Sequence, residues 1–240
     1  MLGTLCTLIT ALTCVDAVIV LTQTPAVHTV STGQEVVLNC NVERDHNRVN
    51  WYKQVPGEAP QYVLTFYRTD SSPTFGSGFS SDRFNSKASS TIDYQFIIKQ
   101  AEAGDSAQYY CEMWDGSASA AVFGQGTKLI VTSSSLPPPV LTVFPPSSTE
   151  LQANKASLVC LSSQSGPFAD VSWLSAGSPV SSGISTSTAV QQPDKTFQIS
   201  SYLSVQTSDW NMDKVYTCKV TQGSQTSEQN IKKSECPAEQ

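Results

Sequence analysis

Apolar and polar residues alternate with a period of two along several short stretches of the chain. The pattern is clear at residues 36–42, 92–99 and 156–160, where every second side chain is apolar. Such alternation predicts β-strands with one buried face, and no long segment repeats with the 3.6-residue period of an amphipathic helix. Turn signals such as Pro56-Gly57 and Gly166-Pro167 separate the stretches. The chain is therefore predicted to be all-β.

One arrangement of cysteine, tryptophan and tyrosine occurs twice. Its members are Cys40, Trp51, Tyr109 and Cys111 in the first half and Cys160, Trp173, Tyr216 and Cys218 in the second. Each tyrosine precedes a cysteine by two residues, which places both side chains on one face of a strand. This order is typical of the immunoglobulin β-sandwich, where a disulfide joins two sheets and the tryptophan packs against it. We expect two such sandwiches in tandem.

The two copies differ in length. Cys40 and Cys111 are 71 positions apart, whereas Cys160 and Cys218 are 58 apart. The difference suffices for about one more hairpin, which variable-type domains have and constant-type domains lack. The predicted organisation is a signal peptide at 1–17, a variable-type domain at 18–132, a Ser- and Pro-rich switch linker at 133–139, a constant-type domain at 140–234 and a tail at 235–240.

Composition places the chain outside the cell. The 240 residues suit two domains, and only 14% of them are charged, so Ser, Thr and Gln must solvate the surface. The formal net charge of −6 argues against nucleic acid or an anionic membrane as a partner. Residues 5–15 resemble the apolar core of a signal peptide, with cleavage expected just before Val18. The alternative is a first buried strand that starts early.

The cysteines fit an oxidising compartment. Cys6 and Cys14 would leave with the signal peptide, and five cysteines would remain. Four can form two bridges, and an odd number predicts an intermolecular bond or a free thiol. Cys236 lies on a polar tail after the last predicted strand, where it suits an interchain disulfide. A free or capped thiol is the alternative. No Cys-x-x-Cys is present, so no metal or cofactor is predicted.

Several runs of sequence resemble one family, the immunoglobulin light chains of the lambda-like kind. The runs are Trp51-Tyr52-Lys53-Gln54, Asp82-Arg83-Phe84, Phe123-Gly124-Gln125-Gly126-Thr127, Phe144-Pro145-Pro146-Ser147-Ser148 and residues 150–156. The third run matches the joining-segment motif Phe-Gly-x-Gly-Thr. Two departures, the long loop at 68–79 and the residues after Cys236, favour a non-mammalian vertebrate source. The resemblance implies a secreted, antigen-binding subunit of adaptive immunity that pairs with a heavy chain.

Strand alternation predicts a partner-docking face in the first domain. Because Trp51 must point inward, Tyr52 and Gln54 point outward, and Tyr110 points outward beside Cys111. Aromatic residues without charges are enriched in interface cores, although two ordinary exposed tyrosines are the alternative. The resemblance adds Pro60 and Phe123 and names the heavy-chain variable domain as partner. It also implies an Arg83–Asp105 salt bridge.

The second domain carries a similar prediction. Val159 lies beside Cys160 and should face outward, and with Phe144 it would form an apolar patch for the first heavy-chain constant domain. The resemblance implies a disulfide-linked heterodimer that assembles into a symmetric antibody. It would be secreted, or held at the cell surface by a membrane heavy chain, with no membrane insertion of its own.

Three segments at one end of the first sandwich should form the antigen-binding loops. The candidate residues are Glu43, Arg44, Asp45, His46, Asn47, Arg68, Thr69, Asp70, Met113, Trp114, Asp115, Gly116 and Ser117. Trp114 is the expected anchor, because an exposed Trp buries a large area at low entropic cost. Packing of Trp114 on the heavy chain is the alternative.

Other classes fit less well. Only two histidines occur, without a nucleophile elbow or a metalloprotease motif, so no enzyme is expected. Adhesion receptors and T-cell receptor chains should continue into a membrane span, and surrogate light chains split the two domains between chains.

Overall fold

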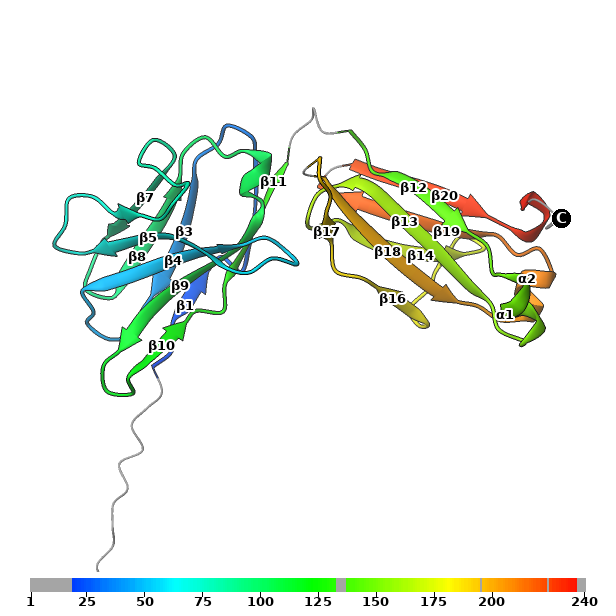
Figure 1. Ribbon diagram of the computed structural model, residues 1–240, viewed down its shortest axis with the longest axis horizontal. Helices are drawn as coiled ribbons and strands as arrows, with labels where there is room; N and C mark the ends of the chain where they lie inside the picture. The colour runs from blue at the N-terminus through cyan, green and yellow to red at the C-terminus, as the bar shows by residue number, and fades with distance from the viewer. Residues whose placement is uncertain (1–18, 133–136, 195, 224, 237–240) are drawn as a thin grey trace, which may run out of the picture.

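The computed structural model describes residues 19–132, 137–194, 196–223 and 225–236, which form two β-sandwiches (Figure 1). The all-β prediction is therefore confirmed. The signal peptide predicted at 1–17, the first four linker residues, 133–136, and the end of the tail, 237–240, lie outside the described residues.

The first sandwich consists of two sheets. One has the order β1-β3-β8-β7 and the other the order β2-β11-β9-β4-β5-β6, with β10 paired to β9. The strands are β1 (Thr22–Thr24), β2 (Val27–Ser31), β3 (Val36–Asn41), β4 (Arg48–Gln54), β5 (Gln61–Tyr67), β6 (Thr74–Phe75), β7 (Phe84–Ala88), β8 (Asp93–Ile98), β9 (Ala107–Asp115), β10 (Ala120–Phe123) and β11 (Thr127–Thr132); a 3-10 turn, η1 (Ala103–Asp105), precedes β9. The extra hairpin expected from the cysteine spacing is β5 with β6.

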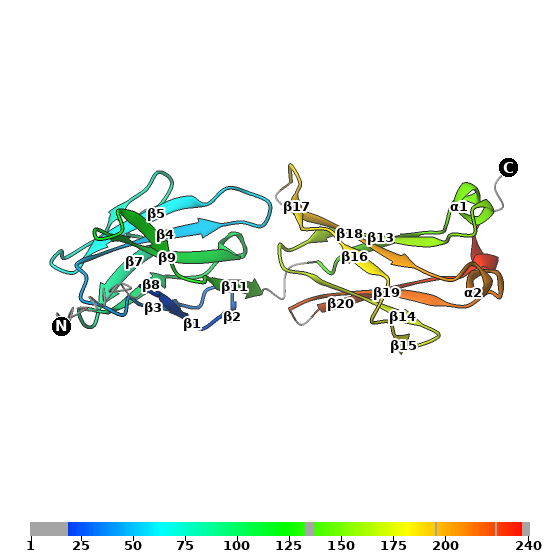
Figure 2. The same cartoon turned by 90° about the horizontal axis from the view of Figure 1, so that it is seen from below.

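The second sandwich is smaller. Its sheets have the orders β12-β13-β18-β16, with β17 paired to β18, and β15-β14-β19-β20. Figure 2 shows these two layers, with β13 and β18 in one and β14, β19 and β20 in the other. The elements are β12 (Val140–Phe144), α1 (Ser148–Gln152), β13 (Ser157–Ser165), β14 (Asp170–Ser175), β15 (Ser178–Pro179), β16 (Ile184–Thr186), β17 (Val190–Gln191), β18 (Phe197–Ser204), α2 (Thr207–Asn211), β19 (Tyr216–Gln222), β20 (Gln225–Ile231) and η2 (Lys233–Glu235).

Each core is built on a disulfide and a tryptophan. Cys40 bonds Cys111 in the first domain, and Cys160 bonds Cys218 in the second. Trp51 is fully buried and stacks on Phe96 at 5.1 Å between ring centroids. In the second domain the buried indole has a hydrogen-bond partner, because Nε1 of Trp173 donates to Oγ of Ser201 at 3.0 Å.

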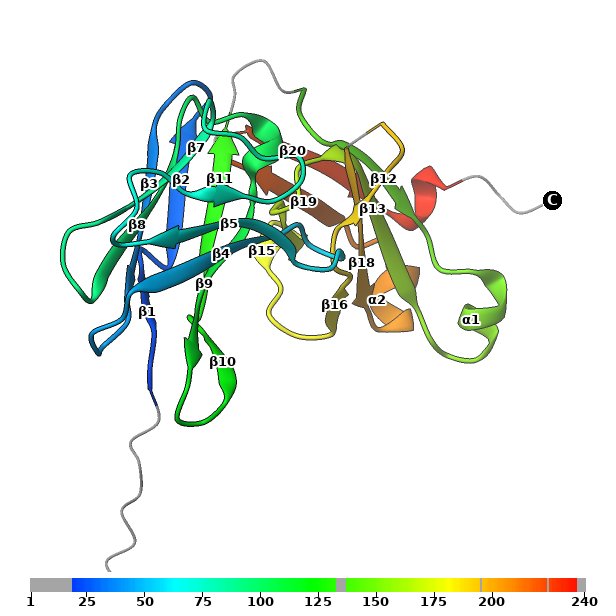
Figure 3. The ribbon, with the colours of Figure 1, turned by 60° about the vertical axis from the view of Figure 1, so that its left-hand side comes forward.

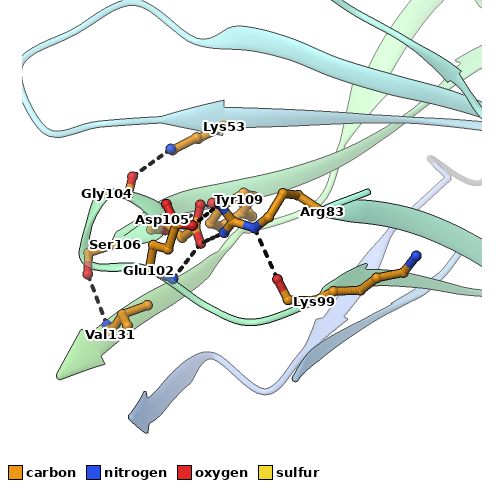
Figure 4. A network of polar contacts seen from close by, with 9 residues as sticks. All are labelled: Lys53, Arg83, Lys99, Glu102, Gly104, Asp105, Ser106, Tyr109 and Val131. Carbon is orange, nitrogen blue, oxygen red and sulfur yellow. Dashed lines mark hydrogen bonds and ion pairs between the residues drawn. The ribbon is translucent and has the colours of Figure 1, made fainter. Parts of the chain in front are cut away.

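A polar network closes one edge of the first sandwich (Figure 4). The guanidinium of Arg83 pairs with the buried carboxylate of Asp105 and, at 2.8 Å, with Glu102. The backbone N–H of Glu102 donates to the same Asp105 carboxylate, at 2.8 Å. The salt bridge implied by the resemblance is present, and it satisfies a charge that burial would otherwise penalise.

The same network holds the tyrosine corner. The hydroxyl of Tyr109 donates to the backbone carbonyl of Asp105 at 2.9 Å. Nζ of Lys53 donates to the carbonyl of Gly104 at 2.6 Å, and burial lowers the pKa of this lysine. The turn before β9 is thereby fixed to β4, so the outward-facing residues of the two strands keep their alignment.

Replacing Arg83 by methionine should destabilise the first domain by about 2–3 kcal/mol, because Asp105 would remain buried without its cation. We expect its calorimetric transition in the full chain to fall by roughly 10 °C. Lys87→Met, an exposed position on β7, is the matched control and should leave the transition in place. Equal transitions for the two variants would contradict a stabilising role for the pair.

Candidate functional site

Four aromatic rings gather on the outer face of the sheet formed by β4, β5, β9 and β10. We call Tyr52, Tyr62, Tyr110 and Phe123 the aromatic patch. Tyr52 lies at its centre, 5.8 Å from Tyr62 and 5.6 Å from Phe123 between ring centroids, and it pairs in register with Tyr110. Phe123 is 52% exposed and Tyr62 is 37% exposed. These strands lie side by side in Figure 3.

The prediction for this face named Tyr52, Tyr110 and Phe123 but missed Tyr62. A register shift between Trp51 and Tyr52 puts Tyr62 opposite Tyr52 and breaks the alternation along β5, where Val63 and Leu64 are both buried. Only the run of aromatic residues in 62–67 could have suggested it. A bulge of this kind is decided by pairing rather than by local pattern.

Glutamines continue the face below the rings. Gln54 pairs in register with Gln108, and its Nε2 donates to the carbonyl of Glu58 at 3.0 Å. Pro60 is exposed and directly precedes β5. Tyr52, Gln54, Tyr110 and Phe123 therefore share one face, with glutamine amides on one side of the rings and the buried carboxylate of Glu112 on the other.

Each of the two glycines in the Phe-Gly-x-Gly-Thr run is required for a different structural reason. A Cβ on Gly126, whose φ is +86°, would collide with the side-chain amide of Gln108. A Cβ on Gly124 would overlap Oε1 of Gln23. Both glycines therefore let neighbouring side chains approach the backbone that comes after Phe123.

Gln23 is a functional support that the sequence reasoning missed. Its side chain is 1% exposed, and its Oε1 accepts from the backbone N–H of Cys111 and of Gly126, at 3.0 and 3.1 Å. Its Nε2 donates to the carbonyl of Tyr109 at 3.0 Å. A single amide thus joins β9, which carries Tyr110 and leads into the third loop, to the segment between β10 and β11.

The second domain has its own apolar row. Phe144 pairs in register with Val159, and Val159 pairs with Tyr202. Phe144 is 46% exposed and Tyr202 is 48% exposed, while Val159 is half-buried. Tyr202 was not predicted, although its buried neighbours Ser201 and Leu203 mark a strand whose pairing with β13 places it outward. We call Phe144, Val159 and Tyr202 the apolar row.

Cys236 is a free cysteine that comes directly after η2. Its Sγ lies 3.4 Å from the carbonyl of Lys232, and the residue is half-buried. Partial burial raises the pKa of the thiol, and the carboxylates of Glu235 and Asp213 raise it further. Asp213 also anchors the segment, because it accepts from both the backbone N–H and the hydroxyl of Ser234, at 2.7 and 2.8 Å.

Two of the three predicted loops are joined directly. The N–H of Arg68 donates to the carbonyl of Asn47 at 2.9 Å, which connects the second loop to the first. Burial lowers the pKa of His46, as Arg48 does, whereas Glu112 and Asp115 on β9 oppose this shift. Most of the other loop candidates are exposed, namely Glu43, Arg44, Asp45, Thr69, Asp70, Gly116 and Ser117.

The third loop corrects one prediction. Trp114 is 47% exposed, but Met113 is only 2% exposed and packs in the core of the first domain. Because β9 continues to Asp115, Met113 still keeps the inward alternation set by Cys111. Met113 is therefore a core residue that supports the loop. Asp115 accepts from the hydroxyl and N–H of Ser117, and these bonds lower the pKa of its carboxyl.

Comparison with known proteins supports the division of the chain. Residues 23–132 match the immunoglobulin V-set domain, and residues 141–225 match the immunoglobulin C1-set domain. A similar protein is a viral T-cell receptor beta chain-like protein of feline leukemia virus, which is 31% identical over 190 residues. The match covers 76% of this chain and 58% of that relative's own length.

Replacing Asp213 by asparagine should increase the rate at which iodoacetamide alkylates Cys236 in the reduced, folded chain. Loss of the negative charge lowers the thiol pKa, so the thiolate fraction near neutral pH rises, and we expect about a two- to five-fold faster reaction. Mass spectrometry of the peptide would measure the rate. Asp194→Asn, an exposed aspartate that also accepts from its neighbour Thr196, is the control. Unchanged rates in the Asp213 variant would contradict the assigned electrostatic effect.

Proposed function

We propose that this chain, a tandem variable and constant immunoglobulin-type protein, is the antigen-binding light chain of an immunoglobulin heterodimer. The aromatic patch carries the proposal, because four rings on one sheet face exceed what a solvated face requires. Aromatic residues are enriched at the cores of protein interfaces, and Lys and Glu are depleted there. The chain is not an enzyme, as its domain families are non-enzymatic.

The partner of the aromatic patch would be the variable domain of a heavy chain. Phe123 is half exposed and Tyr62 about a third exposed, and both rings would lose this solvent contact on pairing. The Gln54–Gln108 pair would then face polar groups of the partner at the edge of the contact. The Phe-Gly-x-Gly-Thr run that carries Phe123 resembles the joining segment of rearranged antigen receptors, which supports a partner of the same receptor type.

In the second domain the apolar row would meet the first constant domain of the heavy chain. Cys236 would form the interchain disulfide and fix the heterodimer covalently. The run 144–148 that begins with Phe144, together with residues 150–156, resembles the lambda constant domain and favours a light chain. Two heterodimers would assemble into a symmetric antibody.

Antigen would contact the exposed loop residues at the far end of the first domain. Trp114 would be the main anchor, with Arg68 and Asp70 from the second loop and Glu43 from the first. We propose a secreted protein, or one held at the cell surface by a membrane heavy chain. Among the described residues, no helix combines the length and apolar character that crossing a bilayer requires.

A T-cell-receptor-type heterodimer is the second candidate. The similarity to a protein described as T-cell receptor beta chain-like favours it. Both functions use paired variable and constant domains, so the aromatic patch does not separate them. The identity of the covalent partner does.

The first experiment is a non-reducing gel of the native protein and of a Cys236→Ser variant. For a light chain we expect the native chain to migrate with an immunoglobulin heavy chain and to be released only by reductant. Cys236→Ser should release it without reductant while the complex persists under native conditions. Migration with a T-cell-receptor-type chain would support the second candidate, and a chain that runs alone in both lanes would count against the interchain bond.

A charge placed in the aromatic patch should weaken pairing. In the Cys236→Ser background, we expect Phe123→Asp to raise the Kd for a heavy-chain fragment by about 30-fold or more, as for a central interface residue. Thr22→Asp is the matched control, because Thr22 is exposed in the same domain but lies on β1, in the other sheet of the sandwich. Surface plasmon resonance measures both. Equal affinities would exclude the patch as the docking face.

A further inference from the structure

Glu112 is a buried carboxylate on the outer face of the first domain. It comes directly after Cys111 on β9 and pairs in register with Phe123 of β10, so it lies beside the aromatic patch. The residue is nevertheless only 4% exposed. A glutamate is almost never this buried unless a partner compensates its charge.

Neutral groups within the chain hold this carboxylate in place. Nδ2 of Asn50 donates to Oε2 of Glu112, and Oδ1 of Asn50 accepts from the hydroxyl of Thr65 at 2.6 Å. The Thr65 hydroxyl lies 2.6 Å from the hydroxyl of Tyr62, a member of the aromatic patch. The three residues Thr65, Asn50 and Glu112 occupy one row across three neighbouring strands. We call them the polar row.

No cation of the described residues forms an ion pair with Glu112. Arg48 lies two positions from Asn50 on β4, toward the loops, and its guanidinium lies over the ring of Tyr67 at 5.9 Å. The negative charge of Glu112 acts on the neighbouring Tyr52. Burial raises the pKa of the Tyr52 hydroxyl most, and the charge of Glu112 raises it further.

The position of the polar row indicates what would cover it. Phe123 continues the row on β10, and Tyr52 lies two residues from Asn50 on the patch side. Arg48 and Trp114 lie two residues from Asn50 and from Glu112 in the other direction, toward the loop tips. A domain that docks on the aromatic patch would remove the remaining water from Glu112. An unpaired carboxylate in such an interface is costly, whereas a basic group opposite it is favourable.

We propose that the partner's variable domain supplies an arginine or lysine that pairs with Glu112, and that this contact selects among partners. The proposal rests on the pairing function and adds the chemistry of the partner. A partner with a neutral or acidic group at this point leaves the carboxylate without a cation. The desolvated, unpaired charge then makes the free energy of binding less favourable. Specificity of this kind arises because a poor partner leaves the charge of Glu112 unneutralised in the interface.

The test uses the full chain with Cys236→Ser, so that association is reversible. Its partners are heavy-chain fragments that contain the variable domain and the first constant domain. The fragments share one framework. They differ only at one position of the heavy chain's own third variable loop, which carries Arg, Lys, Gln or Met. For the chain with native Glu112 we expect Arg or Lys at one position to lower the Kd about tenfold relative to Gln. The preference should disappear with Glu112→Gln and reverse in sign with Glu112→Lys.

Glu35→Gln, an exposed acid of the same domain, is the matched control and should keep the preference. Thermal unfolding of each variant separates a pairing effect from a folding effect, since a merely structural Glu112 would change stability without changing partner preference. A preference that persists in Glu112→Gln overturns the inference alone. A cation effect that appears only when antigen is added assigns Glu112 to the antigen and overturns it as well. Failure of every fragment to bind overturns the pairing function itself.

Discussion

The structure depends on the disulfide in each sandwich, because this bond determines which side chains of the two strands it joins face the core. Once Cys40 and Cys111 are joined, the inward positions of β3 and β9 are set, and a shift by one residue would turn every neighbour to the wrong face. Each bond also restricts the unfolded chain, which by the chain-entropy account contributes about 4 kcal/mol for a loop of this length. The core and the partner surfaces therefore follow from the same alternation, since Tyr52 faces outward because Trp51 faces inward.

In both domains the alternation of inward and outward side chains places apolar residues on an outer sheet face, but the residues differ. In the first, four rings from β4, β5, β9 and β10 lie on the outer face, bordered by glutamine amides and by the buried carboxylate of Glu112. In the second, Phe144, Val159 and Tyr202 form a row across β12, β13 and β18. Two such faces, one on each domain, suit pairing with another immunoglobulin-type chain. The V-set and C1-set matches agree with this division.

The amino-acid pattern predicts the features that depend on alternation within a strand and misses those that depend on pairing between strands. The inward tryptophans and the outward Tyr52 and Tyr110 follow from alternation within a strand, and the two disulfides follow from the repeated Cys-Trp-Tyr-Cys order. Tyr62 reaches the patch through a register shift, which no pattern within β5 reveals. The prediction for Met113 is wrong because a binding loop need not start at the cysteine, and here β9 continues past it. Gln23 and Glu112 lie far from their partners in sequence, and only the fold brings them together.

The buried amide of Gln23 has a consequence for variation. Since it accepts from the N–H groups of Cys111 and Gly126, it closes the base of the β9–β10 hairpin from outside the hairpin, with a side chain that belongs to β1. The tip of the hairpin, residues 116–119, can then change in length and composition while the two strands that carry it stay where they are. Such an anchorage makes diversity easy to generate, because new loop sequences can be tried without any change in the residues that hold them.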